Sequence, residues 1–269
     1  MKENLQDLLL QSLIDQREIF GDELFETKNL KRRTSIEFEP KTQQSEVVKS
    51  QKEIISAKIL SSKNEILTEI PLIKEPKEKW QFSSNLDELN KLICECQKCP
   101  LGKTRNKFVF GTGNPNADVL VVGEGPGADE DAQGLPFVGR AGKLLTDILK
   151  AINFSREEVY IANIVKCRPP GNRTPLPAEM ESCLPYLNKQ IELINPKVIL
   201  CLGLTSAHGL LKKKESLTNL RGKVFDYGKA KVMVTYHPAA LLRNPNWKRG
   251  CWEDVQLFRK LYDEIAQLK

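Results

Sequence analysis

The sequence has no long hydrophobic run. None of its apolar stretches approaches the roughly 18 residues that a membrane-spanning helix requires. The first residues, Met1-Lys2-Glu3, lead into an amphipathic stretch with acidic side chains, which is unlike the apolar core of a signal peptide. The absence of both features predicts a cytoplasmic protein with no membrane segment.

Histidine is also scarce, with two residues in the chain, His208 and His237. Few side chains are therefore available for a role that needs an imidazole. His208 falls within a predicted helix, where a structural or surface role is expected. His237 follows a predicted strand and is the better candidate for chemistry.

What is present is the composition of a soluble globular protein, with 40% hydrophobic and 28% charged residues in a chain of 269. Positive charge is distributed unevenly. Residues 1–80 carry 14 Lys and Arg against 15 Asp and Glu, whereas residues 81–269 carry 27 against 20. An excess of positive charge in the part expected to fold suits a polyanion such as nucleic acid, although charge alone favours an ordinary basic surface.

Seven cysteines are present: Cys94, Cys96, Cys99, Cys167, Cys183, Cys201 and Cys251. An odd number in a chain without a secretion signal argues against a disulfide framework. The Cys96-x-x-Cys99 pair can bind one metal centre, and Cys167 and Cys183 follow at a spacing that is not typical of a zinc ribbon. The spacing alone leaves zinc, an iron–sulfur cluster and no metal open, with Cys94 as a rival ligand. The last two cysteines are expected to pack in the core.

The hydrophobic pattern predicts an α/β domain. Four apolar runs read as strands of a mainly parallel sheet, at 119–124, 159–165, 198–203 and 231–236. Helices are predicted at 85–94, 141–152, 177–194 and 247–268, with a short one ending at 211.

Residues 84–269 form the predicted domain, and residues 1–83 an N-terminal extension. The extension is expected to begin with a short amphipathic helix at 3–25 and to continue as a disordered tether, because it is rich in Lys, Glu, Ser and Gln. An alternative role for the first helix is docking onto a protein partner.

Polar side chains follow three of the predicted strands. Glu124 and Gly125 come after the first, Asn163 lies near the end of the second, and His237 comes after the fourth. Because the carboxyl ends of parallel strands meet at one edge of a sheet, these side chains are expected to converge there. The glycine-rich loop lacks the Lys-Ser/Thr ending of a P-loop, and Pro126 interrupts a dinucleotide fingerprint, so a simple tight turn is the alternative.

Two further segments carry candidate binding residues. Phe137 precedes a predicted helix, where it is either a stacking platform for a flat ring or a core residue. After His237, the residues Leu241, Leu242 and Arg243 form an apolar tip with a positive charge. Such a tip suits insertion into a base stack, and packing of a hydrophobic loop on the core is the other interpretation.

These motifs, taken in order, resemble one family. GEGPGADED, GLPFVGRAGKLL, YIANIVKCRPP, the step from Cys167 to Cys183 and HPAALLRNP follow the sequence of the iron–sulfur, or family-four, uracil-DNA glycosylases. The resemblance runs from about Leu92 to the C-terminus. It implies a three-layer α/β/α fold with a central four-stranded sheet, and an enzyme that flips uracil out of DNA and hydrolyses its N-glycosidic bond.

The resemblance also implies a structural [4Fe–4S] cluster and roles for the site residues. The cluster ligands would be Cys96, Cys99, Cys167 and Cys183. Phe137 would stack on uracil, Asn163 would read its edge, and Glu130 would lie near its C5 side, where a methyl group must be kept out. Glu124 would position water or stabilise positive charge on the sugar, and His237 would donate a hydrogen bond to uracil O2.

Other functions remain to be weighed. A non-catalytic iron–sulfur protein that binds nucleic acid would not need Glu124, Asn163 and His237 together. A zinc-stabilised hydrolase of small nucleotides would need an open metal site, whereas four cysteines would close the coordination shell. The expected partner is uracil-containing DNA, and the protein is expected to be a monomer.

Overall fold

The computed structural model describes residues 78–267. The predicted helix at 3–25 lies outside the described residues, as do residues 26–77 of the predicted tether. The proposed division between an extension at 1–83 and a domain at 84–269 therefore stays a prediction. Among the described residues, no helix is both long enough and apolar enough to cross a membrane.

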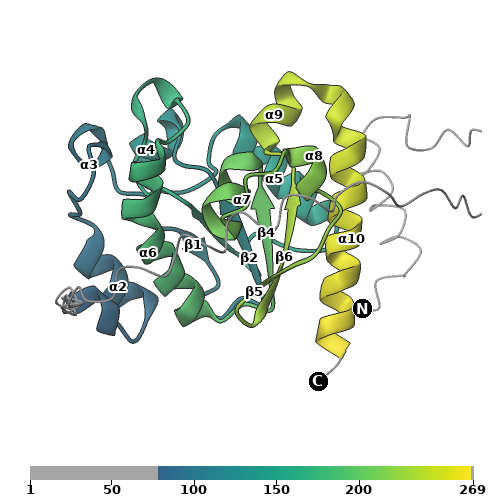
Figure 1. The fold of residues 1–269 in the computed structure, drawn as a ribbon, viewed down its shortest axis with the longest axis horizontal. Coiled ribbons are helices and arrows are strands. Elements are labelled where there is room, and N and C mark those ends of the chain that lie inside the picture. The colour runs from purple at the N-terminus through teal and green to yellow at the C-terminus, as the bar shows by residue number, and fades with distance from the viewer. Residues whose placement is uncertain (1–77, 268–269) are drawn as a thin grey trace, which may run out of the picture. The chain divides into compact units, whose positions relative to one another are not determined.

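A mixed sheet forms the centre of the fold, in the order β1-β3-β2-β4-β6-β5 (Figure 1). The four inner strands are parallel: β3 (Tyr160–Asn163), β2 (Val119–Gly123), β4 (Val198–Leu202) and β6 (Ala230–Thr235). These are the four predicted strands. The edge strands β1 (Thr112–Gly113) and β5 (Phe225–Tyr227) are antiparallel to their neighbours.

The predicted number of four strands was therefore wrong, because the sheet has six. The two additional strands span two and three residues. Segments this short show no alternation of apolar and polar side chains, and only pairing with a longer strand makes them part of a sheet.

Helices cover both faces of the sheet, which confirms the three-layer architecture (Figure 1). One face packs against α2 (Leu86–Ile93), α6 (Pro177–Ile194) and α7 (Leu204–Leu211). The other packs against α5 (Arg140–Ala151), α9 (Pro238–Arg243) and α10 (Lys248–Gln267). Shorter helices are α3 (Leu101–Thr104), α4 (Ala128–Gln133), α8 (Leu217–Leu220), η2 (Lys79–Phe82), η3 (Pro170–Asn172) and η4 (Pro245–Trp247).

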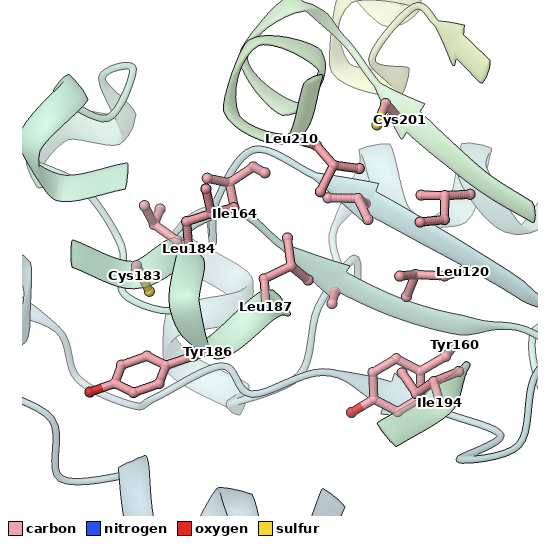
Figure 2. Close-up of a cluster of buried hydrophobic side chains, with 14 of the residues drawn as sticks. Leu120, Tyr160, Ile164, Cys183, Leu184, Tyr186, Leu187, Ile194, Cys201 and Leu210 are labelled. Carbon is pink, nitrogen blue, oxygen red and sulfur yellow. The ribbon is translucent and has the colours of Figure 1, made fainter. Parts of the chain in front are cut away.

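Alternation along each strand divides the core into two layers. In β2, Leu120 and Val122 face the first group of helices, whereas Val119 and Val121 face the second. Figure 2 shows the first layer, in which Leu184 and Leu187 of α6 point onto the sheet. Both faces of the strands are buried, which explains why they read as continuous apolar runs in the sequence.

Local sequence signals account for both ends of α6 and for the start of α2. Pro177 occupies the first turn of α6, and the Glu179 carboxylate accepts the Leu176 backbone N–H at 2.7 Å. Asn195 ends the helix in the left-handed conformation. At α2, the Asn85 side chain caps the first turn by accepting the Glu88 N–H.

The strand order determines where a ligand can bind. The central strand β2 pairs with β3 on one side and with β4 on the other. The chain therefore changes direction beside β2, which opens a crevice at the carboxyl ends of these strands. α4 and α9 lie at this edge of the sheet (Figure 1).

Candidate active site

A cavity of about 390 Å³ opens at the carboxyl edge of the sheet. It brings together the residues that follow three of the parallel strands, as the sequence predicted. Its lining comprises Glu124, Gly125, Pro126, Gly127, Glu130, Phe137, Ala141, Asn163, Pro169, Asn172, Arg173, Thr174, His237, Ala239 and Arg243.

Gly123, the last residue of β2, lets two side chains approach the strand end. A Cβ at this position would lie 2.4 Å from Asn163 Oδ1 and 2.6 Å from Phe137 Cζ. Real side chains do not tolerate such distances, so only glycine allows the amide and the aromatic ring to sit side by side. Gly123 thereby shapes the cavity, although the sequence indicated only a glycine-rich turn at this position.

Asn163 carries an unsatisfied polar atom. The residue is 2% exposed, and its Oδ1 has no hydrogen-bond partner among the described residues. A buried acceptor without a donor costs about 1–3 kcal/mol. Because the side chain lines the cavity, a ligand N–H placed against Oδ1 would recover that energy.

Phe137 is held in a strained backbone conformation. Its φ of 54° falls in the left-handed region, which a bulky residue rarely adopts. Two neighbours impose it. Arg156 donates to the Pro136 carbonyl at 2.5 Å, and Gly142 packs so closely that a Cβ there would lie 1.9 Å from the Phe137 carbonyl oxygen. Phe137 is 7% exposed, and the centre of its ring lies 5.6 Å from the centre of the His237 ring.

His237 caps the first turn of α9 with its own side chain. Its Nδ1 accepts the Ala239 N–H at 3.2 Å. Burial, with a smaller contribution from nearby Arg243, lowers the pKa of His237 to about 4. The imidazole is therefore neutral at pH 7, and its single proton sits on Nε2, which leaves an N–H donor for the cavity.

The two candidate carboxylates differ in their surroundings. Glu130 accepts the backbone N–H groups of Gly127, Val138 and Gly139 at 3.0 to 3.1 Å, and thus ties α4 to the loop that carries Phe137. Glu124 lies directly after β2 and lines the cavity, half-buried. Gly125 next to it packs on Val165, where a Cβ would come within 2.7 Å.

The loop between β3 and α6 also lines the cavity. Arg173 forms a bidentate ion pair with Glu179, at 2.9 and 2.7 Å. The Arg173 guanidinium lowers the pKa of Glu179, which is buried at the start of α6. Sequence reasoning missed this pair, because nothing in the spacing of the two residues separates it from an ordinary surface contact.

The segment after His237 is a helix and not the expected loop. Its helical turn separates the two leucines of the predicted apolar tip. Leu241 is fully buried in the layer beneath α9, so the expectation that it contacts DNA does not agree with the structure. Leu242 is 40% exposed, and Arg243 is exposed and lines the cavity.

The four cysteines implied as ligands come from three segments of the chain. Cys96 and Cys99 lie between α2 and α3, Cys167 follows β3, and Cys183 is on α6. Burial raises the pKa of the Cys167 thiol. The hydrogen bond and charge of Arg105 partly offset this rise, and the nearby Cys99 and Cys96 add to it. Burial, partly offset by Lys166, likewise raises the pKa of Cys183 to about 12, with smaller contributions from Cys167 and Cys99.

Hydrogen-bond donors point at three of these sulfurs. Cys167 accepts from Arg105 Nη1 at 3.2 Å, Cys183 from the Lys166 backbone N–H at 3.3 Å, and Cys96 from the Tyr186 hydroxyl at 3.3 Å. Figure 2 shows Cys183 and Tyr186 leaving α6 on the side away from the sheet layer. Donors of this kind stabilise thiolate charge.

No set of three or more His, Cys, Asp or Glu side chains within residues 78–267 has the spacing to hold a metal ion. The fit to an iron–sulfur cluster rests instead on the donor set, four neighbouring thiols with N–H and O–H groups directed at three of the sulfurs. Cys201 and Cys251 are fully buried elsewhere in the two core layers, as predicted.

Two cationic residues beside the cysteines were missed by sequence reasoning. Besides its bond to Cys167, Arg105 donates to the carbonyls of Cys96 and Cys94, at 2.7 and 2.8 Å. Lys166 is fully buried, and its Nζ donates to the Asn163 carbonyl at 3.0 Å and to Gln190 Oε1 at 2.5 Å. Lys166 thus connects the cysteine centre to the cavity, and its place beside Cys167 was the only available signal.

Comparison with known proteins places the chain in a superfamily. The model of the uracil DNA glycosylase superfamily matches residues 110–261. A type-4 uracil-DNA glycosylase from Archaeoglobus fulgidus is 47% identical over 185 residues, which cover 66% of this chain and 93% of that protein. One from Thermotoga maritima is 49% identical over 178 residues, covering 63% and 93%.

Proposed function

Because this chain belongs to the uracil-DNA glycosylase superfamily, we propose that it removes uracil from DNA by hydrolysing the N-glycosidic bond. The product is an abasic site, the starting point of base excision repair. The observation that carries the proposal is the unpartnered Oδ1 of Asn163 in a cavity that also holds an aromatic ring, a neutral imidazole and a carboxylate.

Asn163 accounts for recognition of the base. Its Oδ1 accepts from uracil N3–H while its Nδ2 donates to O4. Cytosine presents the reverse pattern, an acceptor at N3 and a donor at N4, which leaves both polar groups of the buried amide mispaired. At about 1–3 kcal/mol for each unsatisfied group, this mismatch rejects cytosine.

Phe137 and Glu130 define the flat slot for the ring. Phe137 stacks on the flipped base, and the strained loop that carries it is anchored by the three backbone N–H groups that Glu130 accepts. The anchored Glu130 lines the cavity near the C5 position of the base. A methyl group there would meet a wall that the backbone amides prevent from moving, and this excludes thymine.

Bond cleavage leaves an anionic uracil and a positively charged sugar. His237 Nε2–H donates to uracil O2 as negative charge develops, and a neutral imidazole does so without needing a proton from solvent. The Glu124 carboxylate stabilises the oxocarbenium-like sugar and orients the water that attacks its C1′. The proton released by that water passes to the carboxylate and then to solvent.

In this proposal, α9 is the element that contacts the DNA. Leu242 enters the space that the flipped nucleotide leaves, and Arg243 contacts a neighbouring phosphate. The excess of positive charge within residues 81–269 supports this contact with a polyanion.

We further propose that Cys96, Cys99, Cys167 and Cys183 hold a [4Fe–4S] cluster. Such a cluster supplies cross-linking and no redox chemistry on the substrate, since it ties the segment after α2 to α6 and to the loop after β3. Arg105 and the Lys166 backbone N–H offset the negative charge of the thiolates. A cytoplasmic location and a monomeric state, which the sequence predicts, stay predictions.

The excision activity is tested with an oligonucleotide that carries one uracil and a fluorescent label, followed by alkali to cleave abasic sites. We expect cleavage at uracil and none in a matched oligonucleotide with thymine. His237→Ala removes one hydrogen-bond donor to the leaving group and should lower the rate by about 10²- to 10³-fold. A folded wild-type protein that leaves uracil in place would contradict the proposal and favour a non-catalytic DNA-binding role.

The cluster is tested separately from activity. Cys183→Ser should abolish the broad visible absorbance of the purified protein and its iron content, because a hydroxyl is a poor iron ligand. Cys94→Ser is the matched control, since Cys94 lies beside the centre but outside the proposed ligand set, and it should retain full iron. Equal iron in wild type and Cys183→Ser would show that the ligand assignment is wrong.

A further inference from the structure

Next to the proposed active site lies a second aromatic surface, which the excision mechanism does not use. Trp247 ends η4, four residues after Arg243, and stacks on Tyr236 with ring centres 5.1 Å apart and planes inclined by 16°. Tyr236 immediately precedes His237 in the chain. Trp247 nevertheless remains 42% exposed, so one part of a large, flat ring faces solvent.

The stack is braced from the protein interior. The Arg221 guanidinium lies over the Tyr236 ring, 4.0 Å from its centre, and donates to the Tyr236 hydroxyl at 2.8 Å. Arg221 also donates to the buried Asp254 at 2.6 Å, and Asp254 accepts the Thr235 hydroxyl at 2.7 Å. Gly250 makes room for this arrangement, because a Cβ there would lie 2.6 Å from Arg221 Nη2.

This bracing has a consequence for binding. An exposed aromatic side chain that rotates freely loses conformational freedom when a ligand stacks on it. Trp247 is already oriented by Tyr236, and Tyr236 by Arg221, so little of that cost remains. The Asp254–Arg221–Tyr236–Trp247 series therefore forms a rigid platform for a flat partner.

Charge identifies the partner as nucleic acid. The segment from His237 to Gly250 contains no Asp or Glu and three basic residues, Arg243, Lys248 and Arg249. Arg249 reaches Glu253 at 3.4 Å, and both side chains are well exposed, so this contact leaves the positive character of the surface largely intact. A flat aromatic surface flanked by cations is the usual combination for holding single-stranded nucleic acid.

We propose that Trp247 stacks on an unpaired base of the DNA strand, outside the uracil cavity. The inference rests on the proposed function only in taking DNA as the ligand. In a paired duplex the bases already stack on one another and cannot reach the ring. Trp247 therefore favours single-stranded DNA, or a duplex whose bases are unstacked beside the flipped nucleotide.

Tryptophan fluorescence gives a direct test, because the chain has three tryptophans. Trp80 and Trp252 are 8% and 7% exposed, so Trp247 is the one that a bound base can reach. Titration of the full-length protein with a uracil-free oligothymidylate should quench its emission. Trp247→Phe keeps a ring for stacking, so it should lose most of the quenching while it keeps affinity within about threefold of wild type.

Trp247→Ala tests the binding energy itself. We expect affinity for the single strand, measured by anisotropy of labelled DNA, to fall about 5- to 100-fold, the range for loss of one base–aromatic stack. Affinity for a fully paired, uracil-free duplex should change by less than about threefold. Phe82→Ala is the matched control, since Phe82 is an aromatic residue of η2 that is 66% exposed, and it should change neither value.

Two outcomes would overturn the inference. One is quenching in Trp247→Phe equal to that of wild type. The other is unchanged single-strand affinity in Trp247→Ala, which would leave the platform to a protein partner. Because these measurements use DNA without uracil, they are independent of excision. A wild-type protein that binds through Trp247 but leaves uracil in place would contradict the proposed function and support this inference.

Discussion

His237 acquires its character from a backbone hydrogen bond. A histidine followed by proline in the sequence has no preferred tautomer. Once α9 forms, the Ala239 N–H is directed at Nδ1, and the proton must reside on Nε2. The same burial that disfavours the imidazolium keeps the ring neutral, so one residue acts both as a helix cap and as a fixed donor to the cavity.

The lowered pKa of His237 predicts how the ring titrates. Its pKa of about 4 in the folded protein lies below the ordinary value near 6.5. On acidification the unfolded chain therefore takes up a proton first. The stability that the neutral ring contributes is complete above pH 6.5, declines as the pH falls towards 4, and is absent below that.

NMR of the imidazole nitrogens measures this directly. The chain has two histidines, so His237→Ala assigns the signals by difference. We expect the His237 signals to stay those of the Nε2–H tautomer from pH 8 down to about 5. A midpoint near 6.5 would contradict the neutral ring and, with it, the proposed way in which the leaving group is stabilised.

At the scale of elements, the end of β2 sets the geometry of the site. Predicting the strand was straightforward, because five consecutive buried residues read as an apolar run. The importance of its last residue was not visible. Gly123 matters because β3 brings Asn163 alongside it and the loop before α5 brings Phe137 over it, and both neighbours come from distant parts of the chain.

Gly123→Ala should disable the cavity while leaving the fold intact. The new methyl group would overlap Asn163 Oδ1 and the Phe137 ring, so both must move away from the base. We expect the excision rate to fall at least about 100-fold, since displacements near 1 Å have effects of this size.

Gly228→Ala serves as the control for Gly123→Ala. Gly228, in the turn between β5 and β6, has a φ of 58°, and a Cβ at this position would meet no atom within 4 Å. Its substitution should lower the melting temperature through backbone strain but keep excision near that of wild type. Full activity in Gly123→Ala would show that the close packing at the strand end is not needed.

The segment after β6 shows that helix formation changes which of its side chains are exposed. As an exposed loop, HPAALLRNP would leave both Leu241 and Leu242 at the surface. As α9, begun by His237 and Pro238, it turns Leu241 into the core and Leu242 outwards. Adjacent residues on a helix differ in direction by about 100°, so forming a helix left one leucine of the pair available to DNA.

At the scale of the whole chain, the described structure begins before the predicted domain boundary at residue 84. Trp80 is 8% exposed and packs edge-on against Tyr186, with ring centres 4.9 Å apart, and Tyr186 in turn donates to Cys96. Lys98 lies over both rings and pairs with Glu78. Residues 78–83 thus support the cysteine centre.

Truncation tests whether residues 78–83 are part of the folded domain. A chain of residues 78–269 should retain iron, melting temperature and uracil excision comparable to those of the full-length protein. A chain of residues 84–269 lacks Trp80 and should lose about 3–5 kcal/mol of stability, the usual cost of removing a buried tryptophan. Thermal unfolding and iron content provide the measurements. Loss of activity in the longer fragment would mean that residues 1–77 contribute to the enzyme.

Local sequence patterns were sufficient to predict the parallel strands, the helices of eight or more residues, and the residues that follow each strand. These features depend on local periodicity and on the rule that ligands bind at the carboxyl ends of parallel strands, which require no knowledge of distant contacts. Asn163, His237 and Glu124 were found in this way, and the structure brings them to one cavity, which Phe137 also lines.

The remaining features depend on contacts between distant parts of the chain. The edge strands exist because longer strands offer them hydrogen-bond partners, and the direction of Leu241 depends on a core layer beneath α9. The orphaned oxygen of Asn163, the buried Lys166 and the braced Trp247 each result from groups far apart in the chain. Contacts between distant residues leave no periodic trace in a sequence, because they are selected by packing and not by spacing.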